Sequence, residues 1–220
     1  IVLIPLTVGI SWYMGDRKYY IASVLIMIYS IIPFFAGFES RRPQARELVT
    51  LAVMCAIAVA SRAAFIWAPN FKPIGGITMI TAMAFGPQAG FMTGSLSLIV
   101  SDMIFGQGPW TPWQMFSFGL LGFISGLLAR KGILTEKKPL IDAVIGFLLM
   151  VLVVGPILDT CAIFTMAQMI NTESVLAVYL AGLPVNISQG IAVFLCVLLL
   201  TRPMMNKLER IKIKYGMIEQ

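Results

Sequence analysis

The sequence predicts an all-α integral membrane protein, and three observations lead to this fold class. Hydrophobic residues make up 59% of the 220 residues and charged residues only 12%. In soluble domains, about half of the residues are hydrophobic and about a quarter are charged. The mean hydropathy is +0.89. The apolar residues also form runs of helical length between Pro- and Gly-containing breaks. Because a membrane helix needs about 20 residues, the chain has room for roughly six to eight.

The apolar runs predict three parts: a hydrophobic hairpin with a basic linker over residues 1–45, a six-helix membrane domain over 46–203, and a basic tail over 204–220. The hairpin contains Ile1 to Met14, which is too short to span as written, and Tyr20 to Phe38. The sequence leaves open whether it crosses the membrane once or twice. The six predicted spans are Leu48 to Trp67, Ile74 to Phe85, Ala89 to Phe105, Trp113 to Leu128, Leu140 to Met169 and Val175 to Leu200.

Proline and glycine predict local irregularity in three of these spans. The second span is short and bounded by Gly75, Gly76, Gly86 and Pro87, so we expect an irregular or tilted helix there. The last two spans exceed 25 residues and contain Pro156 and Pro184. We therefore expect kinks, or helix ends that leave the membrane.

Basic residues predict the orientation, because Lys and Arg accumulate on cytoplasmic loops. Twelve of the sixteen basic residues fall on one side of the six-span block, so we expect both of its ends to be cytoplasmic. They are Arg41, Arg42, Arg46, Arg130, Lys131, Lys137, Lys138, Arg202, Lys207, Arg210, Lys212 and Lys214. The basic tail is then a topology anchor or a partner contact, and not a nucleic-acid site.

Missing residues and motifs exclude several functions. The chain has no histidine and no match to the phosphate-binding pattern G-x-x-x-x-G-K-[ST], so it cannot hold ATP by that motif. Cys55, Cys161 and Cys196 each lie alone in an apolar run, which indicates buried small side chains rather than disulfides or metal ligands. We predict no metal site, no intrinsic cofactor and no enzymatic activity.

Ionisable side chains inside spans are candidates for function, because burying a charge in lipid costs several kcal/mol unless it is paired or hydrated. Arg62, Asp102 and Asp159 are all predicted to lie in the outer half of the bilayer. They fit a polar cavity open to the outside, in which Arg62 pairs with an aspartate or holds an anionic ligand group. They fit equally a structural pair that fixes helix register.

Two amides on the last span lie at a similar depth. Asn186 and Gln189 are three residues apart and therefore share a helix face, just after Pro184. They could bind a ligand or join neighbouring helices by hydrogen bonds.

Two predicted external loops concentrate further binding chemistry. The first contains Asn70 and Lys72, and the second, Gly106 to Gln114, contains Gln107, Trp110, Trp113 and Gln114 together with two prolines. Proline and glycine fix the loop shape, and tryptophan offers a flat apolar face, which suits a lid over an aromatic or macrocyclic ligand. The alternative is an interfacial aromatic belt, which accounts for Trp67 but poorly for the paired glutamines and prolines.

Small residues recur every four positions on the first span of the block, at Ala52, Ala56 and Ala60. Such a ridge lets another helix approach closely, either within the bundle or from a partner. It resembles the A-x-x-x-A motif of the S components of energy-coupling factor (ECF) vitamin transporters. The segment GQGPWTPWQMFSFGLLGFISG, residues 106–126, is similar to the third loop and fourth helix of these proteins, most closely the cobalamin type. The resemblance covers about Arg46 to Pro203 and not the hairpin.

The resemblance implies a six-helix substrate-binding subunit of an ATP-driven uptake transporter. It implies that Ala52, Ala56 and Ala60 contact a membrane coupling subunit, and that two cytoplasmic ATPases use the ATP. It places the ligand, cobalamin or a related corrinoid, beneath the loops at Asn70 to Lys72, Gln107 to Gln114 and Gln168 to Glu173. Trp110 and Trp113 would cover its apolar face, while Gln107, Gln114, Asn186 and Gln189 would meet its amides. Without histidine or an exposed thiol, we expect recognition by shape and hydrogen bonds, with no cobalt ligand.

Three alternatives remain. The chain could be an S component for riboflavin, thiamine, folate or pantothenate, because S components share a fold but bind unrelated ligands. It could be an autonomous ion-coupled transporter built around Arg62, Asp102 and Asp159, although the halves show no convincing repeat. An intramembrane aspartyl protease is disfavoured, because neither aspartate follows or precedes glycine in a catalytic context.

Overall fold

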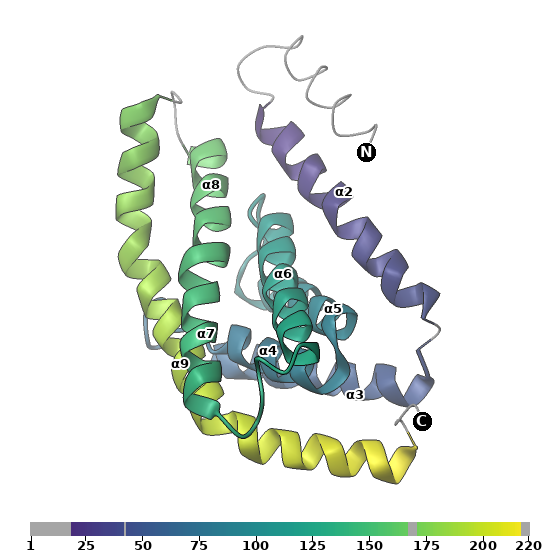
Figure 1. The fold of residues 1–220 in the computed structure, drawn as a ribbon. Helices are drawn as coiled ribbons and strands as arrows, with labels where there is room; N and C mark the ends of the chain where they lie inside the picture. Colours follow the sequence, from purple (N-terminus) through teal and green to yellow (C-terminus); the bar gives the residue numbers. More distant parts are fainter. Residues whose placement is uncertain (1–18, 42, 167–170, 217–220) are drawn as a thin grey trace.

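The computed structural model describes residues 19–41, 43–166 and 171–216, and every regular element in these ranges is helical. Figure 1 shows the helices packed around a short central one. Their bounds are α2 Tyr19–Ser40, α3 Ala45–Ala64, α4 Ile74–Phe85, α5 Pro87–Phe105, α6 Thr111–Arg130, α7 Pro139–Leu149, a π-helical turn η1 Met150–Val154, α8 Gly155–Met166 and α9 Thr172–Tyr215. The all-α prediction is therefore confirmed for the described residues.

The predicted apolar runs match these helices closely. The run Ile74 to Phe85 coincides with α4, which is a regular helix rather than an irregular one, and its tilt in the membrane stays a prediction. The long run from Leu140 forms α7, η1 and α8 without a break, and the π turn lies directly before Gly155 and Pro156. A π turn is a common distortion where a proline removes a helical hydrogen bond.

Helix α9 extends well beyond the predicted last span. It runs for 44 residues through Pro184 and Pro203 to Tyr215, so the basic stretch from residue 204 to 215 is helical. Its last third bends away from the rest of the helix and runs beside α3 (Figure 1). There the Lys212 ammonium donates to the Ala84 carbonyl and lies 4.8 Å from the centre of the Phe85 ring, and Arg46 donates to the Tyr215 carbonyl.

Four described helices are long and apolar enough to cross a membrane by length and composition: Ala45–Ala64, Thr111–Arg130, Pro139–Thr165 and Thr172–Tyr215. Two shorter apolar helices are Val24–Ser40 and Ile74–Phe85. These helices support a multi-pass membrane protein. The count of six spans, the three-part division of the chain and the orientation stay predictions, and residues Ile1 to Met14 lie outside the described ranges.

Helix α4 forms the centre of the core, because ten of its twelve residues are buried. Its first glycines make close contact with α9: a Cβ on Gly75 would lie 2.9 Å from the Val193 side chain, and one on Gly76 would lie 2.6 Å from Cys196. Cys161 and Cys196 are buried as predicted, whereas Cys55 is only half-buried.

Helices α5 and α6 pack through glycines that bring their backbones together. A Cβ on Gly90 would lie 2.7 Å from the Gly122 carbonyl oxygen, and one on Gly126 would lie 2.5 Å from the backbone of Pro87. Ser95 also donates from its hydroxyl to the Met115 carbonyl across the same contact. In lipid, where apolar side chains gain nothing from leaving the solvent, such close backbone packing is a main source of helix association.

The Gly90 contact gives a prediction for stability. Gly90→Ala should lower the stability of the protein by about 1–3 kcal/mol, because the added methyl forces α5 away from α6. Thermal unfolding of the purified protein in detergent measures the loss. Gly37→Ala on α2 is the matched control, since a Cβ there meets nothing within 4 Å. Equal melting temperatures for the two variants would contradict the close contact.

Candidate functional site

A polar network joins the last turn of α3 to the last turn of α5. Nη1 of Arg62 lies 2.9 Å from Oδ1 of Asp102 and 2.9 Å from the hydroxyl of Ser101. The guanidinium also covers the ring of Phe105, with its carbon 4.9 Å from the ring centre. Asp102 is 1% exposed, so its charge depends on this pairing. Of the two partners that the sequence allowed for Arg62, the structure shows an aspartate.

The same carboxylate organises the loop that follows α5. The hydroxyl of Thr111 donates to Oδ2 of Asp102 at 3.0 Å and accepts from the backbone N–H of Gly108 at 3.3 Å. Gly106 starts the loop with φ of 110°, a conformation that other residues adopt only with strain. Both oxygens of Asp102 are thus engaged, and the network fixes the shape of the Gly106 to Trp110 segment.

Lys72, in the loop before α4, adds a second positive charge near this network. Burial lowers the pKa of its ammonium, and the nearby Arg62 lowers it further, while Asp102 acts in the opposite direction. Lys72 thus interacts electrostatically with both members of the Arg62–Asp102 pair.

Asp159 lies apart from this network and pairs with an amide instead. The Asn186 side chain donates to Oδ2 of Asp159 at 2.8 Å, which joins α8 to α9. Glycines make room for the pair, because a Cβ on Gly155 would collide with the Asn186 side chain. The next residue on α8, Thr160, has its hydroxyl 2.8 Å from the hydroxyl of Tyr179 on α9.

The two tryptophans of the predicted loop have different surroundings, because the loop ends at Trp110 and Trp113 lies in the first turn of α6. Trp113 is 4% exposed and stacks on Phe164 of α8 with ring centres 6.1 Å apart, and its indole N–H has no hydrogen-bond partner among the described residues. Trp110 is 38% exposed and lies over Gly108. Trp110 therefore lies at the surface of the loop, whereas Trp113 belongs to the interior.

Gln189 provides a second unpaired polar atom in the interior. The side chain is 5% exposed, and its Oε1 has no partner among the described residues. Val193 of α9 and Phe118 of α6 both lie against Gly75 of α4. Gln189 comes one turn before Val193, and Trp113 comes about one turn before Phe118. Both side chains therefore lie on the loop side of this three-helix contact. A buried donor and a buried acceptor without partners are unusual in a folded protein, and the described residues hold three more such atoms, in Gln88, Ser97 and Asp142.

The remaining predicted ligand residues lie nearer the surface. Asn70 is exposed, with φ of 61°, and Gln107 is exposed at the edge of a cavity, while Gln114 is half-buried. The predicted contribution of Gln168 to Glu173 falls mostly outside the described residues, because 167–170 are not described. The described residues contain no group of three or more His, Cys, Asp or Glu side chains that could hold a metal ion.

Ala52, Ala56 and Ala60 are all exposed on one face of α3. Ala60 also lines an apolar groove of about 550 Å³ between α3 and the last third of α9. Its other lining residues include Val53, Ile57, Met204 and Leu208. The ridge is therefore outside the bundle and beside an open groove.

Sequence reasoning missed five residues that make contacts in these clusters, namely Ser101, Phe105, Thr111, Phe164 and Tyr179. Thr111 precedes a proline, which is typical of a helix start. Phe164 and Tyr179 gave no signal, because aromatic residues are ordinary in apolar helices. Which side chains they contact depends on how the helices cross, and no local sequence pattern shows that.

An all-helical membrane protein with polar side chains buried near its loops belongs to the class that includes solute-transport subunits. A family model described as "ECF-type riboflavin transporter, S component" matches residues 43–206. The chain belongs to this family of ECF transporter S components.

Several proteins are similar to part of the chain. Two are UPF0397 proteins of Clostridium perfringens, from strains SM101 and ATCC 13124, each 27% identical over 124 residues. These matches cover 56% of this chain and 66% of each relative, slightly less than two thirds of its length. A UPF0397 protein of Aliivibrio fischeri is 29% identical over 85 residues, 36% of this chain and 46% of the relative. No solved structure matches the chain.

The Arg62–Asp102 pair gives the second prediction. Arg62→Met should destabilise the protein by about 3–5 kcal/mol, because it leaves the buried Asp102 charge unpaired. The double variant Arg62→Met/Asp102→Leu should recover much of the loss, which thermal unfolding in detergent can follow. If both variants unfold at the same temperature, the pair does not determine stability.

Proposed function

We propose that this chain captures a vitamin at its loop end and delivers it through a membrane coupling subunit driven by two cytoplasmic ATPases. Membership of the S-component family carries the proposal. The absence of the phosphate-binding pattern from the sequence agrees with an energy source on other subunits. In this role, the chain binds and hands over its substrate, and partner subunits hydrolyse ATP.

The unpaired polar atoms near the loops support a binding site there. The Trp113 N–H and Gln189 Oε1 offer one donor and one acceptor inside the bundle. The exposed Trp110 and Gln107 add a flat face and an amide at the loop surface. Arg62, Asp102 and Thr111 hold that loop in shape, so their role in binding would be to position Trp110.

For the substrate, we propose cobalamin or a related corrinoid, which has a broad apolar face and a rim of amides. The loop with two tryptophans and two glutamines supports this choice. Riboflavin is the second candidate, because the matching family model is described by that vitamin. A flat ring system with both donors and acceptors would also satisfy Trp113 and Gln189.

Calorimetric titration of the purified protein with cobalamin, cobinamide, riboflavin, thiamine, folate and pantothenate tests this proposal. We expect tight binding of the corrinoids and no heat from the others. Trp110→Ala should weaken binding by about 2 kcal/mol, or roughly 30-fold, as for a buried aromatic anchor. Trp67→Ala is the control, since that ring is 76% exposed and outside the loop. Binding of riboflavin alone would make riboflavin the substrate in place of a corrinoid. If none of the six compounds binds, the proposed capture of these vitamins is refuted.

The alanine ridge leads to a separate proposal, that Ala52, Ala56 and Ala60 contact the coupling subunit. Their exposure and the groove beside Ala60 support a helix-on-helix contact at this face.

Ala56→Trp should abolish vitamin uptake by the assembled transporter in liposomes and leave the affinity for the vitamin unchanged, because the bulky ring blocks the ridge. Ala177→Trp, at an exposed alanine of α9, is the matched control and should transport normally. Uptake by this chain alone, driven by an ion gradient, would instead favour an autonomous transporter. A fall in affinity with Ala56→Trp would show that the ridge is not a docking face.

A further inference from the structure

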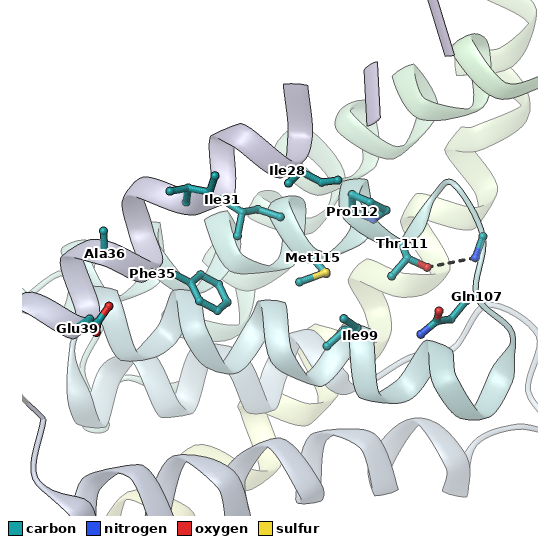
Figure 2. Close-up of a pocket in the computed structure, with 12 residues that line it drawn as sticks. Ile28, Ile31, Phe35, Ala36, Glu39, Ile99, Gln107, Thr111, Pro112 and Met115 are labelled. Atoms are coloured by element: carbon teal, nitrogen blue, oxygen red, sulfur yellow. Dashed lines mark hydrogen bonds between the residues drawn. The ribbon is translucent and has the colours of Figure 1, made fainter. Parts of the chain in front are cut away.

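A cavity of about 650 Å³ lies beside α2 and ends at Gln107, Gly108 and Thr111 (Figure 2). These residues belong to the loop of the proposed vitamin site, so this cavity adjoins that site. The groove of about 550 Å³ beside Ala60 is separate, because its described lining comes from α3, α9 and Ile77 of α4. The chemistry of this groove can therefore be considered apart from that of the vitamin site.

The groove has the length of a short helix and lies between two helices. Its lining on α9 runs from Leu200 to Ile211, which is about 16 Å at 1.5 Å per residue, or three helical turns. Its lining on α3 runs from Thr50 to Ala64. Figure 1 shows the last third of α9 beside α3, so the two helices form the two walls.

The two walls differ in the size of their side chains. At its C-terminal end, α3 presents the small residues Ala60, Ser61 and Ala64, whereas α9 presents larger ones such as Met204 and Leu208. Small residues let another helix approach closely in a membrane, and methionine adapts its shape to a partner. The groove therefore suits a third helix that packs against α3 and is flanked by α9.

The α9 wall is fixed on the bundle. Leu208 is 4% exposed on the packed side of the helix. Further along, the Lys212 ammonium donates to the Ala84 carbonyl at the end of α4, and Arg46 of α3 donates to the Tyr215 carbonyl. The groove is thus preformed, and an occupant need not order this part of α9 when it binds.

One side chain of the described lining is charged, and it belongs to Lys207. Within the part of the chain that the structure describes, the exposed Lys207 forms no ion pair. The hydroxyls of Thr50 and Ser61, which also line the groove, donate to carbonyls of their own helix. The occupant therefore needs an apolar surface with one acceptor, placed where it meets Lys207.

Lys207 also begins a basic stripe on the outer face of α9. Arg210 and Lys214 follow after three and four residues and are both exposed. Residues at these spacings share a helix face. Glu209 lies outside this spacing and interacts electrostatically with Lys212 instead. The stripe therefore adds positive charge along the same edge of the groove.

The place of Lys207 distinguishes a helix from a lipid as the occupant. Met204 and Ile211 line the groove one turn to either side of it, so its charge lies beside the apolar length and not at one end. A phospholipid carries its phosphate at the end of its acyl chains. An amphipathic helix carries charged side chains along the flank of its apolar face. The charge and the shape of the groove together favour the helix.

We propose that the last third of α9 forms the second wall of the docking site for the coupling subunit. The helix that enters the groove has an apolar face and an Asp or Glu on its flank, which pairs with Lys207. This inference rests on the proposed docking of the coupling subunit and adds to it the α9 wall and the charge of the partner. Because the pair lies in an apolar groove, salt screens it less than an exposed pair.

Copurification of the coupling subunit with the tagged chain tests the charge. Lys207→Glu should lower the amount of coupling subunit recovered at least fivefold and leave the vitamin affinity unchanged. Lys137→Glu, at an exposed lysine of the loop after α6, is the matched control and should assemble normally. Equal recovery with Lys207→Glu and the unaltered chain would overturn this inference alone. If no coupling subunit copurifies with the unaltered chain, the proposed function fails together with it.

Photocrosslinking identifies the occupant directly. With p-benzoylphenylalanine in place of Val53, which lines the groove, we expect a crosslink to the coupling subunit in the assembled transporter. The crosslinked peptide should contain an Asp or Glu within about one helical turn of the attachment point. Changing that acid to lysine should restore assembly with Lys207→Glu. A crosslink to lipid alone, a peptide without an acid, or no restoration by the charge exchange would each overturn the proposal.

Discussion

The close contact between α5 and α6 is the constraint on which the rest of the structure depends. Gly90 and Gly122 bring the start of α5 against the second half of α6, and Gly94 lies against the Phe118 backbone nearer the loop. At the loop end of the same helix pair, Asp102 bonds to Thr111 and holds the short loop between the two helices. Phe34 of α2 also rests on rings from both helices, so the position of α2 follows from the same contact.

Most of the helical architecture was predictable, because apolar runs and Pro/Gly breaks are local signals. The bounds of α4 matched the predicted run, and those of α5 differed by two residues. The length of α9 was missed, since its continuation is basic on one side and apolar on the other, as at Lys212 and Ile213. The glycine spacing of α5 and α6, Gly90-x-x-x-Gly94 with Gly122-x-x-x-Gly126, is a local pattern that favours close packing of two membrane helices.

The candidate site was predictable in composition but not in pairing. Intramembrane charge identified Arg62, Asp102 and Asp159, because such residues are costly in lipid. Which aspartate Arg62 meets depends on how α3 crosses α5, and no local pattern encodes that. The same limit explains Trp113: its sequence neighbours indicate a loop, while its contact with Phe164 depends on α8.

The unbroken length of α9 links two regions that would otherwise be independent. Gln189 lies in the interior near the loops, and Lys207 lines the groove beside Ala60, about 27 Å further along the same helix at 1.5 Å per residue. Helix α9 bends between these two residues (Figure 1), so the two regions share one continuous helix but not one axis. Any coupling between them passes through that bend and is reciprocal in binding free energy.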